Sequence, residues 1–434
     1  MKGARDLALL VGLRAAGVVV ALAAGFSHVS DDDYARTVIA EGFAHAPRLD
    51  PSGTSWLPVP FWLMGAAMTC LGRSLEIARG ASIVLALASL VPLHASLRHA
   101  GLSRGGTLLG LAFTILSPWS VWTSAATVPE AFTSALSAAA VFFAVAPPPA
   151  TSGGPPGLAP LASGLLLTLA CLSRYEPWPL APLLASVWLV RAWRERDRLA
   201  LVGAALCLLG PATWMAWNVH AHGSATHFLA RVARYRQSLG EPSLGLADRV
   251  LAYPSLLLVH FPESAVFGAL GVVGLLTDRL PRRLGIVLAA ALGIVAFLAY
   301  GNVRDGAPTH HAERTLLPVA TLLAPLGAEV LLAWVLPGKP RTVAPALLLG
   351  LAWLAGAGAR WSEMPGRGDD DRGSIVARGR AIRERGAPRL EITPCNYEHF
   401  ALIAAFGAPE RVTIRPSQRI PLHPRCPEVR ELPP

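Results

Sequence analysis

The chain has 434 residues, of which 53% are hydrophobic and only 15% are charged, and its formal net charge is +10. Soluble domains carry charge on about 25% of their residues, so this composition excludes an ordinary soluble protein. In a membrane protein, an excess of basic residues marks cytoplasmic loops and does not indicate nucleic-acid binding. We therefore expect an all-α polytopic membrane protein with no nucleic-acid partner.

Apolar segments recur along most of the chain, and many approach the ~20 residues that a spanning helix needs. We expect eleven transmembrane helices near residues 7–28, 78–97, 105–123, 127–146, 159–173, 177–192, 199–217, 258–277, 284–301, 315–336 and 342–359. The first segment lacks a small-residue cleavage site and is interpreted as a retained helix. Its Arg14 is expected to extend toward the inner surface, or else to have a structural partner.

The basic residues predict the orientation of these spans. Lys2 and Arg5 precede the first span, which places the N-terminus in the cytoplasm. The predicted inner loops then contain Arg98, Arg104, Arg191, Arg194, Arg196, Arg198, Arg279, Arg282, Arg283, Lys339 and Arg341. Of the inner loops, only 147–158, which is rich in Pro and Gly, lacks basic residues. We expect a multi-pass protein of the bacterial inner (cell) membrane.

The outer face should hold the loops 29–77, 218–257 and 302–314 and a C-terminal tail. Residues 56–72, "WLPVPFWLMGAAMTCLG", are short and begin with Pro and Trp, which favours a helix in the outer interface. Residues 244–260 may form a second interfacial helix of this kind. The chain thus divides into a transmembrane domain at 1–359 and a small extracytoplasmic α/β domain at 360–434.

The tail changes composition sharply and predicts regular secondary structure of its own. It should form an arginine-rich helix, a strand at "RLEIT", a helix at "NYEHFALIAAFG" and a strand at "ERVTIRP". Its two cysteines are Cys395 and Cys426. A disulfide between them is plausible because the expected compartment is oxidising.

Three adjacent aspartates, Asp31, Asp32 and Asp33, follow the first span directly. Ser30 is a suitable N-cap, and Tyr34 begins one apolar face, so residues 30–46 should form an amphipathic helix on the outer surface. The helix dipole alone would favour carboxylates there. Three of them together could instead bind a divalent cation, or one could act as general base for a hydroxyl.

The order of several motifs resembles the GT-C glycosyltransferases, such as the protein O-mannosyltransferases and the lipid A aminoarabinose transferases. An acidic group and an aromatic residue follow the first span, then comes the Pro-rich segment "SWLPVPFWLMGAAMTCLG", and then an Arg opens "ARGASIVLALASL". Later matches are "TVPEAF", "LSRYEPWPLAP" and "ERTLLPVATLLAPLG". The resemblance covers residues 1–200 and, more loosely, 300–335. It departs from the family where Asp33 directly precedes Tyr34.

This resemblance implies transfer of a sugar from a polyprenyl-phosphate donor to an envelope lipid, glycan or protein acceptor at the outer face. The catalytic base would be Asp32, with Asp31 and then Asp33 as alternatives, and arginines would hold the leaving phosphate. The candidate substrate-binding residues are Arg174, Glu176, Arg314, His310, His311, Glu130 and Arg79. No cofactor is certain, although a divalent cation is possible. Each of these residues also has a structural alternative, as a surface ion pair, a helix cap or an interfacial anchor.

Two other classes of function remain open. A transporter or flippase of lipid-linked sugars would also bind a phosphate head group, but it should carry ionisable residues deep in several spans. A non-catalytic membrane protein with a partner-binding tail would leave the acidic loop without a role. The charged residues gather at one predicted face, which favours an enzyme.

Overall fold

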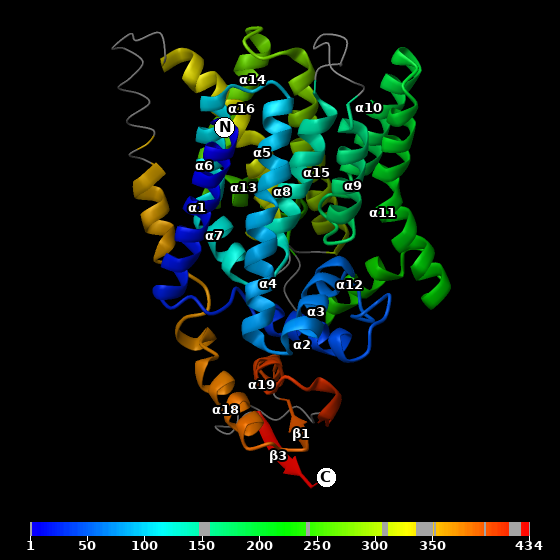
Figure 1. Cartoon of the computed structure of the whole chain (residues 1–434), viewed down its shortest axis with the longest axis vertical. Coiled ribbons are helices and arrows are strands. Elements are labelled where there is room, and N and C mark those ends of the chain that lie inside the picture. Colours follow the sequence, from blue (N-terminus) through cyan, green and yellow to red (C-terminus); the bar gives the residue numbers. More distant parts are fainter. Residues whose placement is uncertain are drawn as a thin grey trace.

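The computed structural model describes residues 2–146, 157–239, 244–305, 311–335, 350, 353–394, 396–415 and 427–433. Most of them form one bundle of helices (Figure 1). The bundle contains α1 (Lys2–Ala23), α4 (Leu75–Ala88), α5 (Leu90–His99), α6 (Arg104–Ile115), α7 (Pro118–Ala125), α8 (Glu130–Ala144), α9 (Ala159–Cys171), α10 (Leu180–Glu195), α11 (Arg198–His222), α14 (Pro262–Leu276), α15 (Gly285–Asp305) and α16 (Leu317–Val335). Residues 353–361 are also helical.

Shorter elements flank this bundle. The helices α2 (Asp32–His45), α3 (Val59–Leu71) and α12 (His227–Leu239) lie at the end opposite the N-terminus (Figure 1). Helix α13 (Leu246–His260) packs against α15 and against the 3-10 turn η3 (Ala312–Leu316). A second such turn, η2 (Arg282–Leu284), precedes α15.

The first ten expected spans each coincide with a helix or a helix pair, and 342–359 lies largely outside the described residues. Within the described part of the chain, five helices are long and apolar enough to cross a membrane. The number rises to seven if each of two bent pairs counts as one span. The helical membrane class is therefore confirmed, while the total of eleven spans stays a prediction.

Three elements differ in detail from what the sequence predicts. The segment 105–123 is not one straight helix, because α6 and α7 meet at 68° where Pro118 cannot continue the helical hydrogen bonds. The loop 218–257 contains the unexpected helix α12. The acidic helix α2 begins at Asp32 without a side-chain cap, and it is not a surface helix, since half of its 14 residues are buried.

Close packing at glycines holds α16 inside the bundle. An 18-residue window of the span Ala312–Trp334, which includes most of this helix, is 78% buried, the highest value among the five described helices that could cross a membrane. A Cβ at Gly110 of α6 would lie 2.5 Å from the backbone of Pro325, and one at Gly327 would lie 2.4 Å from Phe267. Only glycine permits such approaches between membrane helices. This packing fixes the position of α16. The turn η3, which contains Arg314, directly precedes this helix.

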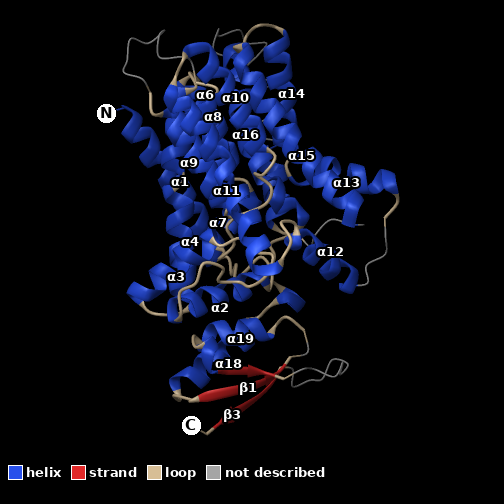
Figure 2. Ribbon diagram, turned by 90° about the vertical axis from the view of Figure 1, so that its right-hand side faces the viewer, coloured by secondary structure: helices blue, strands red, loops and turns tan. Residues whose placement is uncertain are grey.

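The C-terminal segment, residues 368–433, forms a small α/β unit at the far end of the bundle (Figure 2). It contains η4 (Gly368–Asp370), α18 (Gly373–Glu384), β1 (Arg389–Thr393), α19 (His399–Phe406), η5 (Pro409–Arg411), β2 (Val412–Ile414) and β3 (Glu428–Leu432). The strand order is β2-β1-β3, with β2 parallel and β3 antiparallel to β1. The expected βαβ pattern is confirmed, but β3 was not foreseen. Cys395 and Cys426 lie outside the described residues, so their disulfide stays a prediction.

This segment packs directly on α2. Tyr34 and Leu75 share an apolar cluster with Val376 and Ala401 of the segment. At its edge, Arg73 makes a two-pronged ion pair with Glu410, at 2.8 and 3.0 Å. Helix α2 therefore lies between the bundle and the C-terminal unit, which explains why its polar side chains are buried.

Candidate active site

The three aspartates of α2 face three different environments. Asp33 is 2% exposed, and its carboxylate accepts hydrogen bonds from the backbone amides of Val29, Ser30 and Thr127. Asp31 pairs with Arg372 of the C-terminal segment at 3.0 Å. Both groups hold parts of the chain together. Asp32 is the member that points elsewhere, toward the bundle.

Asp32 joins a network of arginines and carboxylates at the end of the bundle. It accepts a hydrogen bond from Arg314 of η3 at 2.7 Å, and Arg314 also lies 3.3 Å from Glu130 at the start of α8. Glu130 in turn pairs with Arg174 at 2.8 Å, and Arg174 pairs with Glu176. The structure thus brings together residues that are 282 positions apart in the sequence.

Several buried atoms of this network have no hydrogen-bond partner. They are Nη1 of Arg314, Nε and Nη1 of Arg36, and Oε2 of Glu130. Buried polar groups are nearly always paired in folded proteins, so unpaired ones require an explanation such as a missing ligand. Three of these atoms are cationic donors, the groups that best bind a phosphate.

Arg36 was not identified from the sequence. It is 4% exposed, lies one helical turn after Asp32 on α2, and stacks its guanidinium 4.4 Å from the ring of Trp56. The spacing of four residues could have revealed it, because residues i and i+4 share a helix face. From the sequence alone, this face is expected to meet water.

The charges of the network influence one another strongly. Burial alone would raise the pKa of the Asp32 carboxyl, but the charges of Arg314 and Arg36 outweigh burial and hold that pKa below its usual value. Burial lowers the pKa of Arg36 to about 10. Burial also opposes the charge of Arg174, but the carboxylates of Glu130 and Glu176 raise its pKa above the usual value. At neutral pH these three groups are therefore ionised.

The histidine segment lies beside the network, and only part of it is described. His311 has φ +50 and lies 3.1 Å from Glu313, and its ring is 5.8 Å from that of Trp119. His310 lies outside the described residues. Among the residues that the structure describes, no group of three or more His, Cys, Asp or Glu side chains is arranged to hold a metal ion. The divalent cation stays an expectation, and no site for it is found among the described residues.

Arg79 has a different environment from the other candidates. Its guanidinium donates to the carbonyl of Ser27, which follows α1. This bond connects α4 with the end of the first helix. Of the candidate substrate-binding residues, the network thus unites Arg174, Glu176, Arg314 and Glu130 with Asp32.

Comparison with known proteins supports the fold. No protein-family model and no curated protein sequence matches the chain. The structure is similar to ArnT from Cupriavidus metallidurans bound to undecaprenyl phosphate, with a TM-score of 0.55, 16% identity, and coverage of 93% of this chain and 75% of ArnT. The apo state of ArnT gives a TM-score of 0.54 at 15% identity, covering 94% and 76% of the two chains.

A third similar structure is the oligosaccharyltransferase of Archaeoglobus fulgidus in complex with Zn and sulfate. Its TM-score is 0.51 at 14% identity, and the match covers 87% of this chain and 55% of that one. The chain therefore has the fold of these two membrane glycosyltransferases, in keeping with its five to seven helices that could cross a membrane. At these identities the similarity establishes the fold, and the activity has to be argued from the site.

Proposed function

We propose that this protein is a membrane glycosyltransferase. It would move a sugar from a polyprenyl-phosphate donor to a hydroxyl group of an envelope lipid, glycan or protein at the outer face of the inner membrane. Asp32 would be the general base. The observation that supports this most directly is the ion pair of Asp32 with Arg314, beside three buried guanidinium nitrogens of Arg36 and Arg314 that lack partners.

The network contains both parts that the reaction requires. In the transfer, the acceptor oxygen forms a bond to the anomeric carbon, and the bond from that carbon to the phosphate oxygen breaks. The acceptor proton goes to the Asp32 carboxylate, and the lipid phosphate leaves with the bonding electrons. The unpaired nitrogens of Arg36 and Arg314 would stabilise the charge that develops on this phosphate.

The ion pair of Arg314 also provides a reason for Asp32 to become a stronger base when the donor binds. In the free protein, the charge of Arg314 holds the pKa of Asp32 below its usual value. A donor phosphate would share this guanidinium and so weaken its effect on the carboxylate. The pKa of Asp32 would then rise, and proton transfer from the acceptor would become easier.

The arrangement of the chain ends supports the proposed orientation. The N-terminus lies at one end of the bundle, and α2, which carries Asp32, lies at the other, beside the C-terminal segment (Figure 1). If the basic loops face the cytoplasm as expected, the network faces the outer side. The structure of ArnT with undecaprenyl phosphate provides the chemical class of donor to test first.

Binding and transfer should be measured with the purified full-length protein in lipid nanodiscs. The first probe is undecaprenyl phosphate, which should bind to the wild type and bind more weakly to Arg36→Gln and Arg314→Gln. Arg415→Gln provides a control, since Arg415 pairs with Glu391 in the C-terminal sheet. Equal affinity of all four proteins would contradict the proposed phosphate site.

The second measurement distinguishes an enzyme from a transporter of the same lipids. Undecaprenyl-phosphate sugars carrying a radiolabel are incubated with the protein and with extracted envelope lipids and glycans. A glycosyltransferase releases free undecaprenyl phosphate and forms a new labelled product. A flippase changes only the leaflet in which the intact donor lies, and that result would refute the proposal.

A further inference from the structure

A second polar site lies inside the bundle, around Arg14 of α1. Its side chain is only 3% exposed and donates hydrogen bonds to the carbonyl of Ala86 at 3.1 Å and the hydroxyl of Ser120 at 2.7 Å. The guanidinium therefore does not extend to the inner surface, and the structural alternative applies. Both of these partners are uncharged, and Nε is buried without any partner. A buried charge needs further polar groups to replace its lost hydration.

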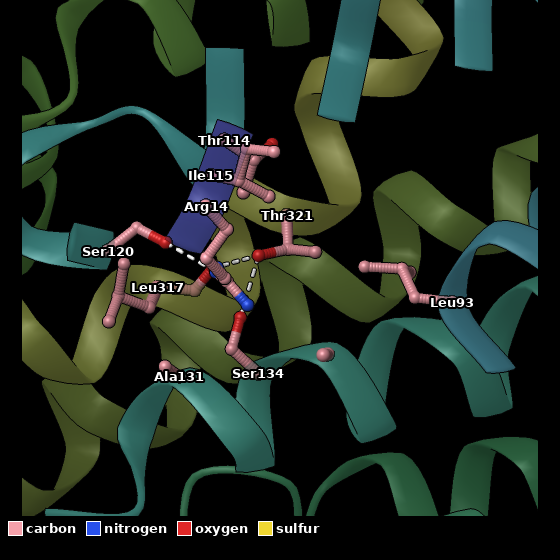
Figure 3. Close-up of a pocket in the computed structure, with 10 residues that line it drawn as sticks. Arg14, Leu93, Thr114, Ile115, Ser120, Ala131, Ser134, Leu317 and Thr321 are labelled. Carbon is pink, nitrogen blue, oxygen red and sulfur yellow. Dashed lines mark hydrogen bonds between the residues drawn. The ribbon is translucent and has the colours of Figure 1, made fainter. Parts of the chain in front are cut away.

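The Arg14 side chain borders a cavity of about 10 Å³. The hydroxyl-bearing residues Ser120, Ser134 and Thr321 gather around the guanidinium, and Thr114 lines the same cavity (Figure 3). A volume of this size holds about one water molecule. Cavities that stay dry are apolar, whereas this one is lined by Arg14 and by four residues that carry a hydroxyl group.

The hydrogen-bond inventory decides what kind of guest fits. The Thr321 hydroxyl donates to the Leu317 carbonyl at 2.8 Å, so its oxygen accepts the 2.7 Å hydrogen bond from Ser134. The protons of these two hydroxyls are thereby used, and their remaining lone pairs can only accept. Nε of Arg14, in contrast, can only donate. One guest that accepts from Nε and donates to these two oxygens would satisfy all three atoms; water does both, whereas an inorganic anion cannot donate.

We propose that this cavity is a binding site for a single water molecule. The water accepts a hydrogen bond from Nε of Arg14 and donates to the hydroxyl oxygens of Ser134 and Thr321. It thereby solvates the charge and connects α1 with α8 and α16. Helix α8 begins at Glu130, and α16 follows the turn that contains Arg314. The inference concerns the packing of the bundle and does not depend on the proposed function.

The direct test is an electron cryo-microscopy map of the wild-type protein in nanodiscs, at a resolution that shows ordered water elsewhere in the molecule. We expect a peak at hydrogen-bonding distance from Nε of Arg14 and from at least one hydroxyl oxygen. An empty cavity in such a map would overturn the proposal. This test needs no variant and so cannot fail through misfolding.

A double-mutant cycle tests the energetic link through the water. Arg14→Met and Ser134→Ala are combined, and melting temperatures are measured in nanodiscs. We expect the pair to depart from additivity by about 2 °C, because both changes remove partners of the same water. Ser137→Ala is the matched control, since its hydroxyl lies one turn further on α8 and donates only to the Thr133 carbonyl. Additivity in both cycles would contradict a shared guest.

An anion in the cavity is the remaining outcome, and the salt composition detects it. The melting temperature of the wild type is compared in sodium chloride and in sodium gluconate at equal ionic strength. A water-filled site predicts equal values. A higher melting temperature in chloride that disappears in Arg14→Met would show that the cavity binds an anion and would overturn the assignment to water.

Discussion

The three aspartates of α2 should respond differently to the same conservative change, Asp to Asn. The structure gives each a separate role: Asp31 ties down the C-terminal segment, Asp32 faces the arginine network, and Asp33 anchors the start of the helix. Asparagine keeps the shape of the side chain and removes its charge. The series therefore separates the chemical role of the carboxylate from its structural roles.

For Asp32→Asn we expect a large loss of transfer and a small loss of stability. The side chain of Asp32 is 39% exposed, and Arg314 keeps Glu130 as a partner at 3.3 Å. An ion pair of this exposure contributes at most about 1 kcal/mol to folding. Loss of a general base reduces turnover by about 10²–10⁴-fold. The expected variant is folded, binds undecaprenyl phosphate and transfers almost no sugar.

For Asp33→Asn we expect the opposite pattern. One carboxylate oxygen accepts from the amides of Val29 and Ser30, and the other accepts from Thr127. An asparagine has one acceptor oxygen, so at least one buried N–H loses its partner, at a cost of about 1–3 kcal/mol. The melting temperature should fall by several degrees, while the folded fraction should retain measurable transfer.

The assay measures labelled product per folded molecule in nanodiscs, with the folded fraction taken from size-exclusion chromatography and the melting curve. Asp31→Asn is the matched control, because Arg372 keeps Glu398 at 3.5 Å and the side chain of Asp31 lies outside the network. Full transfer by Asp32→Asn, together with loss of transfer by Asp31→Asn at equal folding, would refute the assignment of the base.

Three further changes test other parts of the structure. Burial raises the pKa of Glu41 well above its usual value. The wild-type protein should therefore lose stability as the pH rises from the ordinary Glu pKa through the raised one. Glu41→Gln should abolish this loss, and melting curves from pH 4.5 to 8.5 measure it. Arg314→Lys should keep the charge but lose the fork geometry, and a binding assay should show weaker undecaprenyl phosphate binding with unchanged stability. Gly110→Val should prevent the approach of α6 to Pro325 and lower the melting temperature by several degrees, whereas Gly12→Val, which meets open space, should not.

Much of the membrane part could be predicted from the sequence. Long apolar runs identify helices whatever their neighbours are, because the bilayer requires every backbone group to be bonded within the segment. Arg174, Glu130 and Arg314 were singled out because they stand at the expected outer ends of spans. The structure places all three in the network with Asp32.

The remaining features depend on tertiary contacts that no local pattern contains. Glu41 lies on the side of α2 where α19 and η5 dock, and Arg36 lies on the other side of the helix, over the ring of Trp56. The sequence pattern of a 14-residue helix with polar and apolar faces is the same whether the polar face contacts water or protein. The strand β3 joins its sheet through a pairing with β1 that lies more than thirty residues away, which local propensity cannot reveal.

The position of α2 between the bundle and the C-terminal segment has a consequence for biosynthesis. Residues 32–45 leave the ribosome early, whereas the helices that cover them, α18 and α19, end only at residues 384 and 406. Until α18 and α19 have been synthesised, they cannot cover the acidic helix, and Glu41 is open to water. A stop codon that spares the membrane helices but removes α18 and α19 would therefore leave Glu41 and the apolar face of α2 uncovered.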